Sequence, residues 1–515
     1  MRMQTIVFTD TNRLALKYQT TNEEVLSLIN RNLLGRSDVE FLLLDAKDYQ
    51  EELGNAPDWK EYKGILADFL MGMGLTPNPK LGLFIIGGDD VIPMPRIDNP
   101  LNFDNVPLQS DFLYCFKCDF PKVVKASSAQ CYVGRLPLED GVMKTSLTDD
   151  LQSYFNLANM MLGTGIEVNN VLMTSTQSWL PASNDMVKGL PIDAPYPVAE
   201  ATKENMYVSP RLDLEDKYVL DFYKQDIGQA DLLMFNLHGS DYPSHSSFYG
   251  EGAEGHNNPE AFNLGLFRYS SARIFNTVAC FGARYIGYGR DNSMLLSAIY
   301  GGGIMLYAGS CTTALGRSGQ RHVAAQDILV PSGMAESFMK LYTLYLFGGA
   351  TAGEVFLRAK CDYFNTCRAL DGDDAALATI LMFNLYGLPT LHVNRKKDVT
   401  DEARGIKEVL PVDITKQTAY KTLYDKNNEG ERGLLADVQM RVDRNLLMIR
   451  RTIENKLYTY WGLNPSDVCR IDQIVENNQP KGYRFEYSKK GNIIDSRSWA
   501  YTDNMGNVKD VIHLK

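Results

Sequence analysis

Short apolar runs bounded by turn-forming residues alternate with segments of helical periodicity between Gln4 and Thr366. This alternation restricts the fold more than any other feature, because it is the pattern of strand–helix units wound around a parallel sheet. The predicted strands are short and mainly apolar, as expected for strands buried on both faces: 4–8, 39–44, 82–86, 130–133, 170–174, 232–236, 274–278 and 303–307. The predicted helices between them include 23–30, 59–73, 148–162, 335–347 and 351–366.

The composition changes around Arg395–Glu402, from glycine-rich and apolar to charged, which marks a domain boundary. Beyond it, apolar residues spaced three and four apart predict an amphipathic helix over 434–460. An alternating aromatic pattern at 483–487 precedes turn residues at 489–492, and a second turn signal follows at 503–507. These signals predict antiparallel hairpins, so we expect the tail to form an accessory module without a catalytic constellation.

The chain has 515 residues, with 63 acidic and 52 basic side chains and a net charge of −11. Negative charge opposes non-specific binding to phosphate backbones and anionic membranes, so we expect neither nucleic acid nor a membrane as partner. No window approaches the roughly 18 apolar residues of a spanning helix. The first residues also lack the pattern of a secretory signal. We expect a cytoplasmic protein, although a secreted protein whose leader has been removed would look the same.

Two predicted strands end directly in side chains that can do chemistry. The run 232–237 leads into His238-Gly239, and the run 274–278 leads into Ala279-Cys280. The carboxyl ends of parallel strands form the sites of open α/β sheets, and adjacent strand ends would bring the histidine and the cysteine together. Their separation, 280 − 238 = 42 residues, allows one helix or loop excursion between neighbouring parallel strands.

A cysteine beside a histidine forms a nucleophile with its own proton carrier. The imidazole can take the thiol proton and pass it to a leaving amine. Gly239 lets the chain after the histidine approach a substrate closely, and its N–H could form an oxyanion hole with that of Cys280. A lone histidine or cysteine at a strand end is more often structural, so the prediction depends on the pair.

With these residues the chain resembles the caspase-like clan of cysteine peptidases, and within it the gingipain family. The resemblance extends beyond His238 and Cys280 to five segments in the family's order. They are a strand with a Gly-Asp turn and an Ile-Pro segment, a Ser-Asp-x-x-Tyr segment, a Gly-Arg strand end, a helix and a closing segment: 83–93, 110–114, 133–137, 151–158 and 384–391. The tail does not match the family's immunoglobulin-like extension.

The resemblance implies an α/β fold, with a caspase-like, doubly wound, mostly parallel sheet flanked by helices. It also implies a smaller N-terminal α/β subdomain, a catalytic subdomain and, here, a C-terminal α+β extension: 1–162, 163–396 and 397–515. The implied activity is that of a cysteine endopeptidase, which hydrolyses peptide bonds through an acyl-enzyme. His238 would be the general acid and base and Cys280 the nucleophile, with the amides of Gly239 and Cys280 as oxyanion donors.

In gingipains an acidic residue orients the catalytic histidine, and Gln177 stands at the corresponding place here. Glutamine can hold an imidazole by a hydrogen bond but cannot stabilise an imidazolium by charge, so either another acid serves or the dyad works alone. The family selects basic P1 side chains with an acidic loop residue, for which Asp185 and Asp241 are candidates. A helix N-cap or turn residue explains either aspartate equally well. The resemblance requires no cofactor; we assign no metal ligand and cannot place a structural calcium ion on particular residues.

The expected partner is a peptide or protein substrate. Two other functions stay open. The missing acid favours a catalytically silent or latent peptidase-like scaffold, whereas the intact His-Gly and Ala-Cys pairs oppose it. The helix predicted at 434–460 is suggestive of an intracellular protease controlled by a regulatory protein that binds 397–515. Terminal helices commonly pack on their own catalytic domain, however, which is the simpler explanation.

Overall fold

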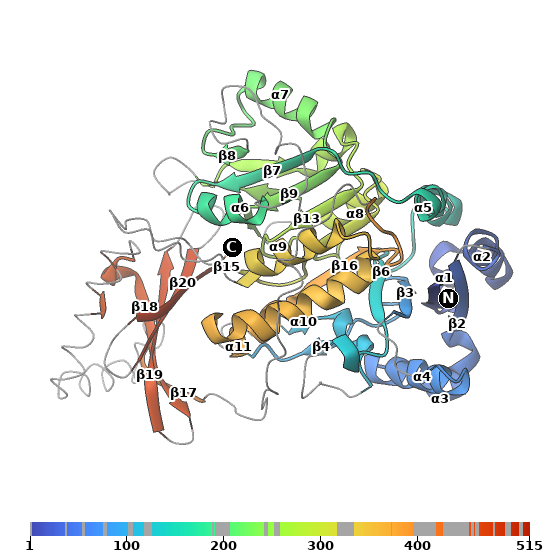
Figure 1. Cartoon of the computed structure of the whole chain (residues 1–515), viewed down its shortest axis with the longest axis horizontal. Coiled ribbons are helices and arrows are strands. Elements are labelled where there is room, and N and C mark those ends of the chain that lie inside the picture. Colours follow the sequence, from blue (N-terminus) through green and yellow to red (C-terminus); the bar gives the residue numbers. More distant parts are fainter. Residues whose placement is uncertain are drawn as a thin grey trace.

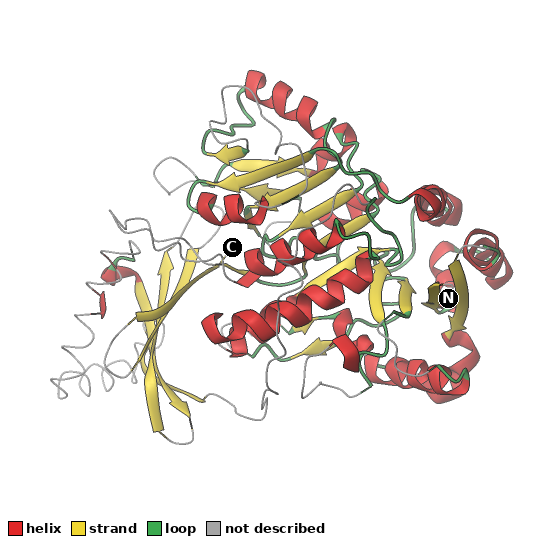
Figure 2. Ribbon diagram, in the orientation of Figure 1, coloured by secondary structure: helices red, strands yellow, loops and turns green. Residues whose placement is uncertain are grey.

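The protein is described here from a computed structural model, in which a large sheet flanked by helices is joined to a smaller sheet near the C-terminus (Figure 1, Figure 2). The structure describes residues 3–36, 39–53, 57–75, 80–100, 107–117, 126–187, 190, 206–240, 246–251, 258–316, 334–371, 373–394, 419–425, 453–454, 458, 463–476, 479–489, 496–503 and 508–514. Within these ranges, no helix has the length and apolar character needed to cross a membrane.

The large sheet has ten strands in the order β2-β1-β3-β6-β16-β14-β13-β9-β7-β8. Neighbouring strands are parallel on both sides of an antiparallel pairing between β14 and β16. The sheet therefore consists of two parallel halves that run in opposite directions. The first half contains β1 (Met3–Thr9), β2 (Val39–Asp45), β3 (Gly82–Ile86), β6 (Tyr132–Leu136) and β16 (Phe383–Gly387). The second half contains β7 (Val171–Thr176), β8 (Tyr207–Ser209), β9 (Leu232–Asn236), β13 (Ile274–Thr277) and β14 (Leu306–Ser310).

The predicted α/β class and mostly parallel sheet are confirmed, and each predicted strand overlaps an observed one. The strand predicted at 303–307 begins later, at Leu306, because Gly303 has a φ of +66° and belongs to the connection after helix α8 (Met294–Tyr300). The helices are α1 (Thr11–Tyr18), α2 (Asn22–Ile29), α3 (Gln50–Leu53), α4 (Trp59–Gly72), α5 (Ser153–Thr164), α6 (Leu180–Val187), α7 (Lys217–Ile227), α8 (Met294–Tyr300), α9 (Met334–Leu346), α10 (Ala352–Asp371) and α11 (Asp373–Met382).

Strand β16, which joins the two halves, was not among the predicted strands. It follows helix α11 directly, so residues 375–388 form one nearly continuous apolar run. Periodicity cannot divide such a run into a buried helix and a buried strand. The predicted boundary between two subdomains at 162/163 stays a prediction. The ten-stranded sheet contains strands from both sides of this boundary, so the sheet itself does not mark it.

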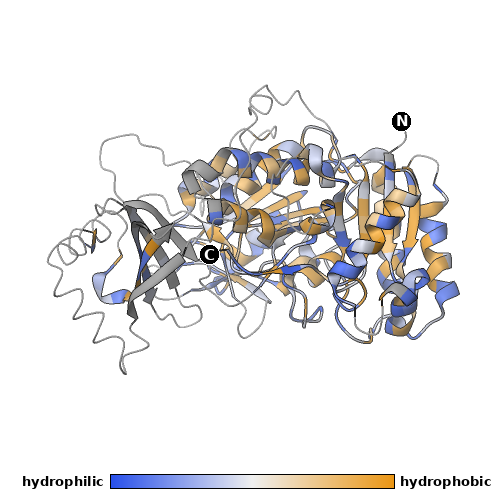
Figure 3. Ribbon diagram, turned by 90° about the horizontal axis from the view of Figure 1, so that it is seen from below, coloured by the Kyte–Doolittle hydropathy of each residue, from blue (hydrophilic) through white to orange (hydrophobic). Residues whose placement is uncertain are grey.

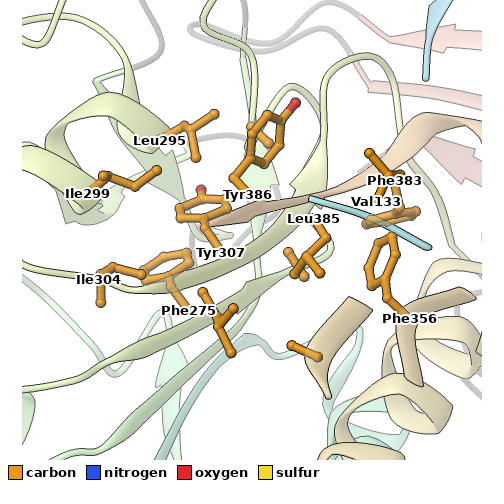
Figure 4. Close-up of a cluster of buried hydrophobic side chains, with 14 of the residues drawn as sticks. Val133, Phe275, Leu295, Ile299, Ile304, Tyr307, Phe356, Phe383, Leu385 and Tyr386 are labelled. Carbon is orange, nitrogen blue, oxygen red and sulfur yellow. The ribbon is translucent and has the colours of Figure 1, made fainter. Parts of the chain in front are cut away.

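The core of the protein crosses the junction between the two halves. Figure 4 shows one cluster of buried side chains that contains Val133 and Leu385 from the first half and Phe275 and Tyr307 from the second. The rings of Phe275 and Tyr307 are stacked, with centroids 4.7 Å apart. Apolar residues line the strands of the large sheet, while the outer sides of the helices carry the hydrophilic ones (Figure 3). This burial is the main stabilising contribution to the fold.

Several segments that carry the family resemblance meet in one buried polar network. Arg135, in the Gly-Arg segment, is 0% exposed and forms two hydrogen bonds with the Asp111 carboxylate, of 2.7 and 2.8 Å. Its guanidinium also donates to the backbone oxygens of Gly87 and Ile92. The hydroxyl of Tyr114 donates to the Pro93 oxygen. These motif residues hold the first half of the sheet together, which is a structural role.

The tail forms an antiparallel sheet that confirms the predicted hairpins. Its strands are β17 (Ala419–Asp425), β18 (Val468–Glu476), β19 (Gln479–Lys489), β20 (Ser496–Asp503) and β21 (Val508–Leu514). Strand β19 ends at Lys489 and strand β20 ends at Asp503, where the two predicted turn signals begin. A short strand from the large unit, β15 (Leu315–Gly316), forms the edge of this sheet beside β21. The predicted boundary at 395–402 and nearly all of the predicted helix 434–460 lie outside the described residues.

Candidate active site

His238 lies just beyond the carboxyl end of β9, where the chain leaves the large sheet. It begins β10 (His238–Gly239), which pairs with β11 (Ser247–Tyr249), and β11 pairs with β12 (Glu260–Asn263). The stretch 240–259, which its composition predicts to be a mobile surface loop, therefore contains a buried strand. This small sheet fixes the backbone of His238, whose side chain is 13% exposed.

Cys280 lies beyond the end of the neighbouring strand β13, level with His238. Strands β9 and β13 pair in parallel, with Leu232 opposite Ile274, an offset of 274 − 232 = 42 residues. The offset between His238 and Cys280 is the same, 280 − 238 = 42. Both residues therefore lie three positions beyond the last paired residues, Phe235 and Thr277. That their side chains act together stays a prediction.

The backbones of the two strand ends touch at Gly239. A Cβ atom on Gly239 would lie 1.8 Å from the carbonyl oxygen of Cys280, which is far inside any real contact. Glycine is therefore required at this position for a steric reason that differs from the predicted approach of a substrate. The contact also brings the predicted oxyanion donors, Gly239 and Cys280, into one place.

The turn that carries Cys280 is tightly constrained. Phe281, the next residue, has a φ of +53°, which is uncommon for a residue other than glycine and is concentrated at functional sites. Its amide donates to the oxygen of Thr312 at 2.8 Å. The Cys280 sulfur contacts Ala314 twice, accepting from its amide at 3.2 Å and lying 3.4 Å from its oxygen. Cys280 is only 1% exposed.

A carboxylate that sequence reasoning missed lies beside the histidine. Oε1 of Glu251 is 3.7 Å from Nε2 of His238, which is within ion-pair range. The other oxygen of this carboxylate accepts from the amide of Ser178 at 3.1 Å. The Ser209 hydroxyl and the Glu251 backbone exchange hydrogen bonds of 3.0 Å, which hold this segment against β8. Burial raises the pKa of Glu251, but His238 and Ser178 lower it by more, so the pKa lies below its ordinary value.

Trp179 completes the surroundings of the histidine. It follows β7 and is 2% exposed, and its ring centroid lies 4.4 Å from that of His238 at a tilt of 55°. The position of Trp179 obeys the same rule that identified the dyad, since it too follows the carboxyl end of a parallel strand. That rule was the available signal for Trp179, whereas Glu251 lies in a stretch without clear periodicity.

Two of the remaining predicted residues, Gln177 and Asp185, have partners other than His238. Gln177 has an exposed side chain, and its amide donates to the Ser209 oxygen, so the acidic group beside His238 is Glu251. Asp185, on α6, forms a 2.7 Å salt bridge with Lys340 of α9. Asp241 lies outside the described residues. Within the described part of the chain, no three or more His, Cys, Asp or Glu side chains gather as metal ligands would.

No family model matches the chain, and no curated protein matches it in sequence. The structure is similar to a solved structure of a protease, with a TM-score of 0.45 and 10% identity over 99% of this chain and 96% of that chain. It is also similar to the complex of the pro- and mature domains of RgpB from Porphyromonas gingivalis, with a TM-score of 0.44 and 8% identity over 99% of both chains. Function therefore has to be derived from the side chains themselves.

Proposed function

We propose that the protein is a cysteine endopeptidase in which Cys280 is the nucleophile and His238 carries the proton. The observation that supports this most strongly is the meeting of the two strand ends, with Gly239 against the Cys280 carbonyl and an equal offset of 42 residues. The carboxyl ends of parallel strands are where open α/β sheets form their sites, and a thiol activated by a neighbouring histidine is a nucleophile for acyl transfer.

In the proposed reaction, His238 takes the thiol proton and the Cys280 sulfur attacks the carbonyl carbon of the scissile amide. The amides of Gly239 and Cys280 would stabilise the negative oxygen that forms. The C–N bond then breaks as His238 gives its proton to the leaving amine, which leaves a thioester. Water attacks the thioester, His238 takes its proton, and the thiol is restored when the acid product leaves.

Glu251 would act as a positioning residue for His238. Its carboxylate can stabilise the imidazolium that forms when the histidine holds a proton, a role that a glutamine cannot fill. Because the pKa of Glu251 is lowered, this carboxylate stays ionised under conditions that protonate ordinary ones. Glu251 thus supplies the acid that the family pattern appeared to lack at Gln177.

The proposal includes a preference for Arg or Lys at P1, for which Asp185 and Asp241 are the candidate residues. The charge of Asp185 is compensated by Lys340, which leaves Asp241 as the better candidate for a basic-P1 pocket. The second candidate function, a silent scaffold, is favoured by one observation: the Cys280 thiol is covered in this structure.

The test compares the wild type with Cys280→Ala on a pooled peptide library, read by mass spectrometry with and without calcium under reducing conditions. The matched control is Cys469→Ala, which removes a thiol on β18 of the tail sheet. We expect internal cleavage by the wild type and Cys469→Ala and none by Cys280→Ala. Cleavage that survives Cys280→Ala would contradict the proposal, and silence from all three proteins would favour the scaffold.

A second measurement uses the other cysteines as internal references. Burial raises the pKa of the Cys311 thiol to about 12, and it also raises the pKa of Cys361 well above its ordinary value. Both therefore remain unreactive thiols at neutral pH. A peptide electrophile should label Cys280 before either of them, and labelling that ignores Cys280 would count against its role as nucleophile.

A further inference from the structure

The last described strand of the chain lies beside the candidate nucleophile. Strand β21 pairs antiparallel with β15, with Leu514 opposite Leu315 and His513 opposite Gly316. In Figure 1 the C-terminal end of the chain lies beside β15, between the tail sheet and helix α9. A strand of the large unit is thus completed by a strand that lies almost 200 residues later in the sequence.

Strand β15 directly follows a residue that contacts the Cys280 sulfur. It begins one residue after Ala314, whose amide donates to that sulfur at 3.2 Å. Because the Ala314 amide contacts this sulfur, a peptide that presents its carbonyl group to the sulfur would pass close to Ala314. Extended peptides commonly bind by adding a strand to such a backbone edge. Gly316 also bridges to Met334 on another side, so β21 takes the edge that faces the tail sheet.

We infer that β21 occupies in cis the strand position that an extended peptide would take along β15, and that β21 must leave before a peptide reaches Cys280. This inference rests on the proposed function. It deepens that proposal by assigning control of the site to residues 508–514. The observed state is the closed one, because Cys280 is 1% exposed and Ala314 and Leu315 are 0% exposed.

The pairing of β21 is suited to reversible release. Its ladder with β15 extends over the two residues of that strand, whereas its ladder with β20 runs from Ser498 to Thr502. The longer ladder can hold β21 in the tail sheet while the shorter one opens. Opening would then expose the edge of β15 without unfolding either unit.

A reversible cross-link in the full chain tests this. In the variant Leu315→Cys/Leu514→Cys, the two new thiols lie directly opposite each other across an antiparallel pair, at a separation that a disulfide can span. The readout is the rate at which a chloroacetamide peptide labels Cys280, measured by mass spectrometry after the reductant has been removed. We expect labelling to be at least tenfold slower in the oxidised than in the reduced form.

The matched control is Ala500→Cys/Val511→Cys, which ties β21 to β20 and leaves β15 untouched. Its labelling rate should change less than twofold on oxidation. The single variant Leu315→Cys reports any mispairing with Cys280 itself. Equal labelling rates in the oxidised and reduced forms of the Leu315→Cys/Leu514→Cys variant would overturn the inference.

Release is tested by Leu514→Pro, which places a residue without an N–H at the pairing position. We expect faster labelling of Cys280 and faster peptide cleavage than in the wild type. If peptides are cleaved but neither the Leu315→Cys/Leu514→Cys cross-link nor Leu514→Pro changes the labelling rate of Cys280, the proposed function stands and the inference is contradicted. If the labelling rate of Cys280 changes in the β21 variants but no peptide is cleaved, the inference about β21 stands and the proposed peptidase function is contradicted.

Discussion

The two halves of the large sheet have the same architecture but use the carboxyl ends of their strands differently. In the first half, these ends carry Asp10, Asp45 and Asp90. Asp10 caps helix α1 by accepting from the Arg13 amide, and Asp45 accepts from the amide and hydroxyl of Thr11. Asp90 forms a 2.7 Å ion pair with Lys17. Each carboxylate is therefore used to hold the chain itself together.

In the second half, the strand ends carry Trp179, His238 and Cys280. The ring of Trp179 lies against His238, and the backbone beside His238 touches that of Cys280. Glu251, two residues beyond β11, lies beside His238. Because the halves run in opposite directions, the two sets of strand ends lie at opposite edges of the sheet. A polar residue at a strand end is thus not enough for a site. Such residues form a candidate site only where neighbouring strand ends bring reactive groups close and these groups are not already bonded to other parts of the chain.

The largest effect is expected from breaking the structural network of the first half. Asp111→Asn removes the counter-ion of the fully buried Arg135 and should lower the free energy of unfolding by about 3–5 kcal/mol. Chemical denaturation measures this. The control is Asp185→Asn, which breaks the partly exposed pair with Lys340 and should cost about 1 kcal/mol or less. Equal losses in the two variants would remove the distinction between buried and surface pairs.

The next effect is expected where the strand ends of the second half touch. Gly239→Ala forces a methyl group onto the Cys280 carbonyl and should separate the two backbones. A displacement of about 1 Å in a catalytic group costs about 100-fold in rate, so we expect a loss of that size in kcat/KM. Gly64→Ala is the control, because its Cβ in α4 would contact nothing within 4 Å. Full activity in Gly239→Ala would show that the contact has no bearing on the chemistry.

A smaller effect is expected from neutralising the acid beside the histidine. Glu251→Gln should lower kcat/KM by about 10- to 100-fold, because general acid–base catalysis as a whole contributes about 10²–10⁴-fold. Gln177→Ala should leave it unchanged, since that side chain is exposed. The reverse ranking of the two variants would return the orienting role to Gln177.

The wild type and the Glu251→Gln variant also allow a test of pH dependence. The pKa of Glu251 is lowered in the folded protein, so its ionised form contributes stability above its ordinary, unfolded pKa. That contribution is lost as the pH falls through the lowered pKa. The stability difference between the wild type and Glu251→Gln should therefore be present at neutral pH and vanish in strong acid. A difference that is independent of pH would indicate packing instead of charge.

A last prediction concerns a group whose titration acts on folding, away from the candidate site. Lys360 donates to the Phe383 oxygen and lies over the ring of Phe112, and burial lowers its pKa to about 7. The unfolded chain then binds more protons between about pH 7 and 10, so wild-type stability should rise over this range, by at most about 1.4 kcal/mol per pH unit. Lys360→Met should flatten this slope in thermal unfolding, while a slope unaltered by the substitution would assign it to other groups.

The contrast between the halves also explains what could be predicted. Strands such as 82–86 and 232–236 are fully buried apolar runs, and the structure places them as predicted. β16 escaped prediction because a buried helix runs directly into it. Glu251 escaped because only a three-residue strand, β11, connects it to the sheet. Two hydrogen bonds to Ser209 fix its place, and no local pattern encodes them.

The sequence by itself determined the α/β class, the strands that end in His238 and Cys280, and the hairpins of the tail, because period and turn chemistry are local properties. The tertiary structure alone decided that the two halves of the sheet run in opposite directions. It also decided that Glu251 lies beside the histidine and that β21 lies along β15. These are pairings between segments far apart in the chain, and their free energy depends on the completed core instead of on any short stretch of residues.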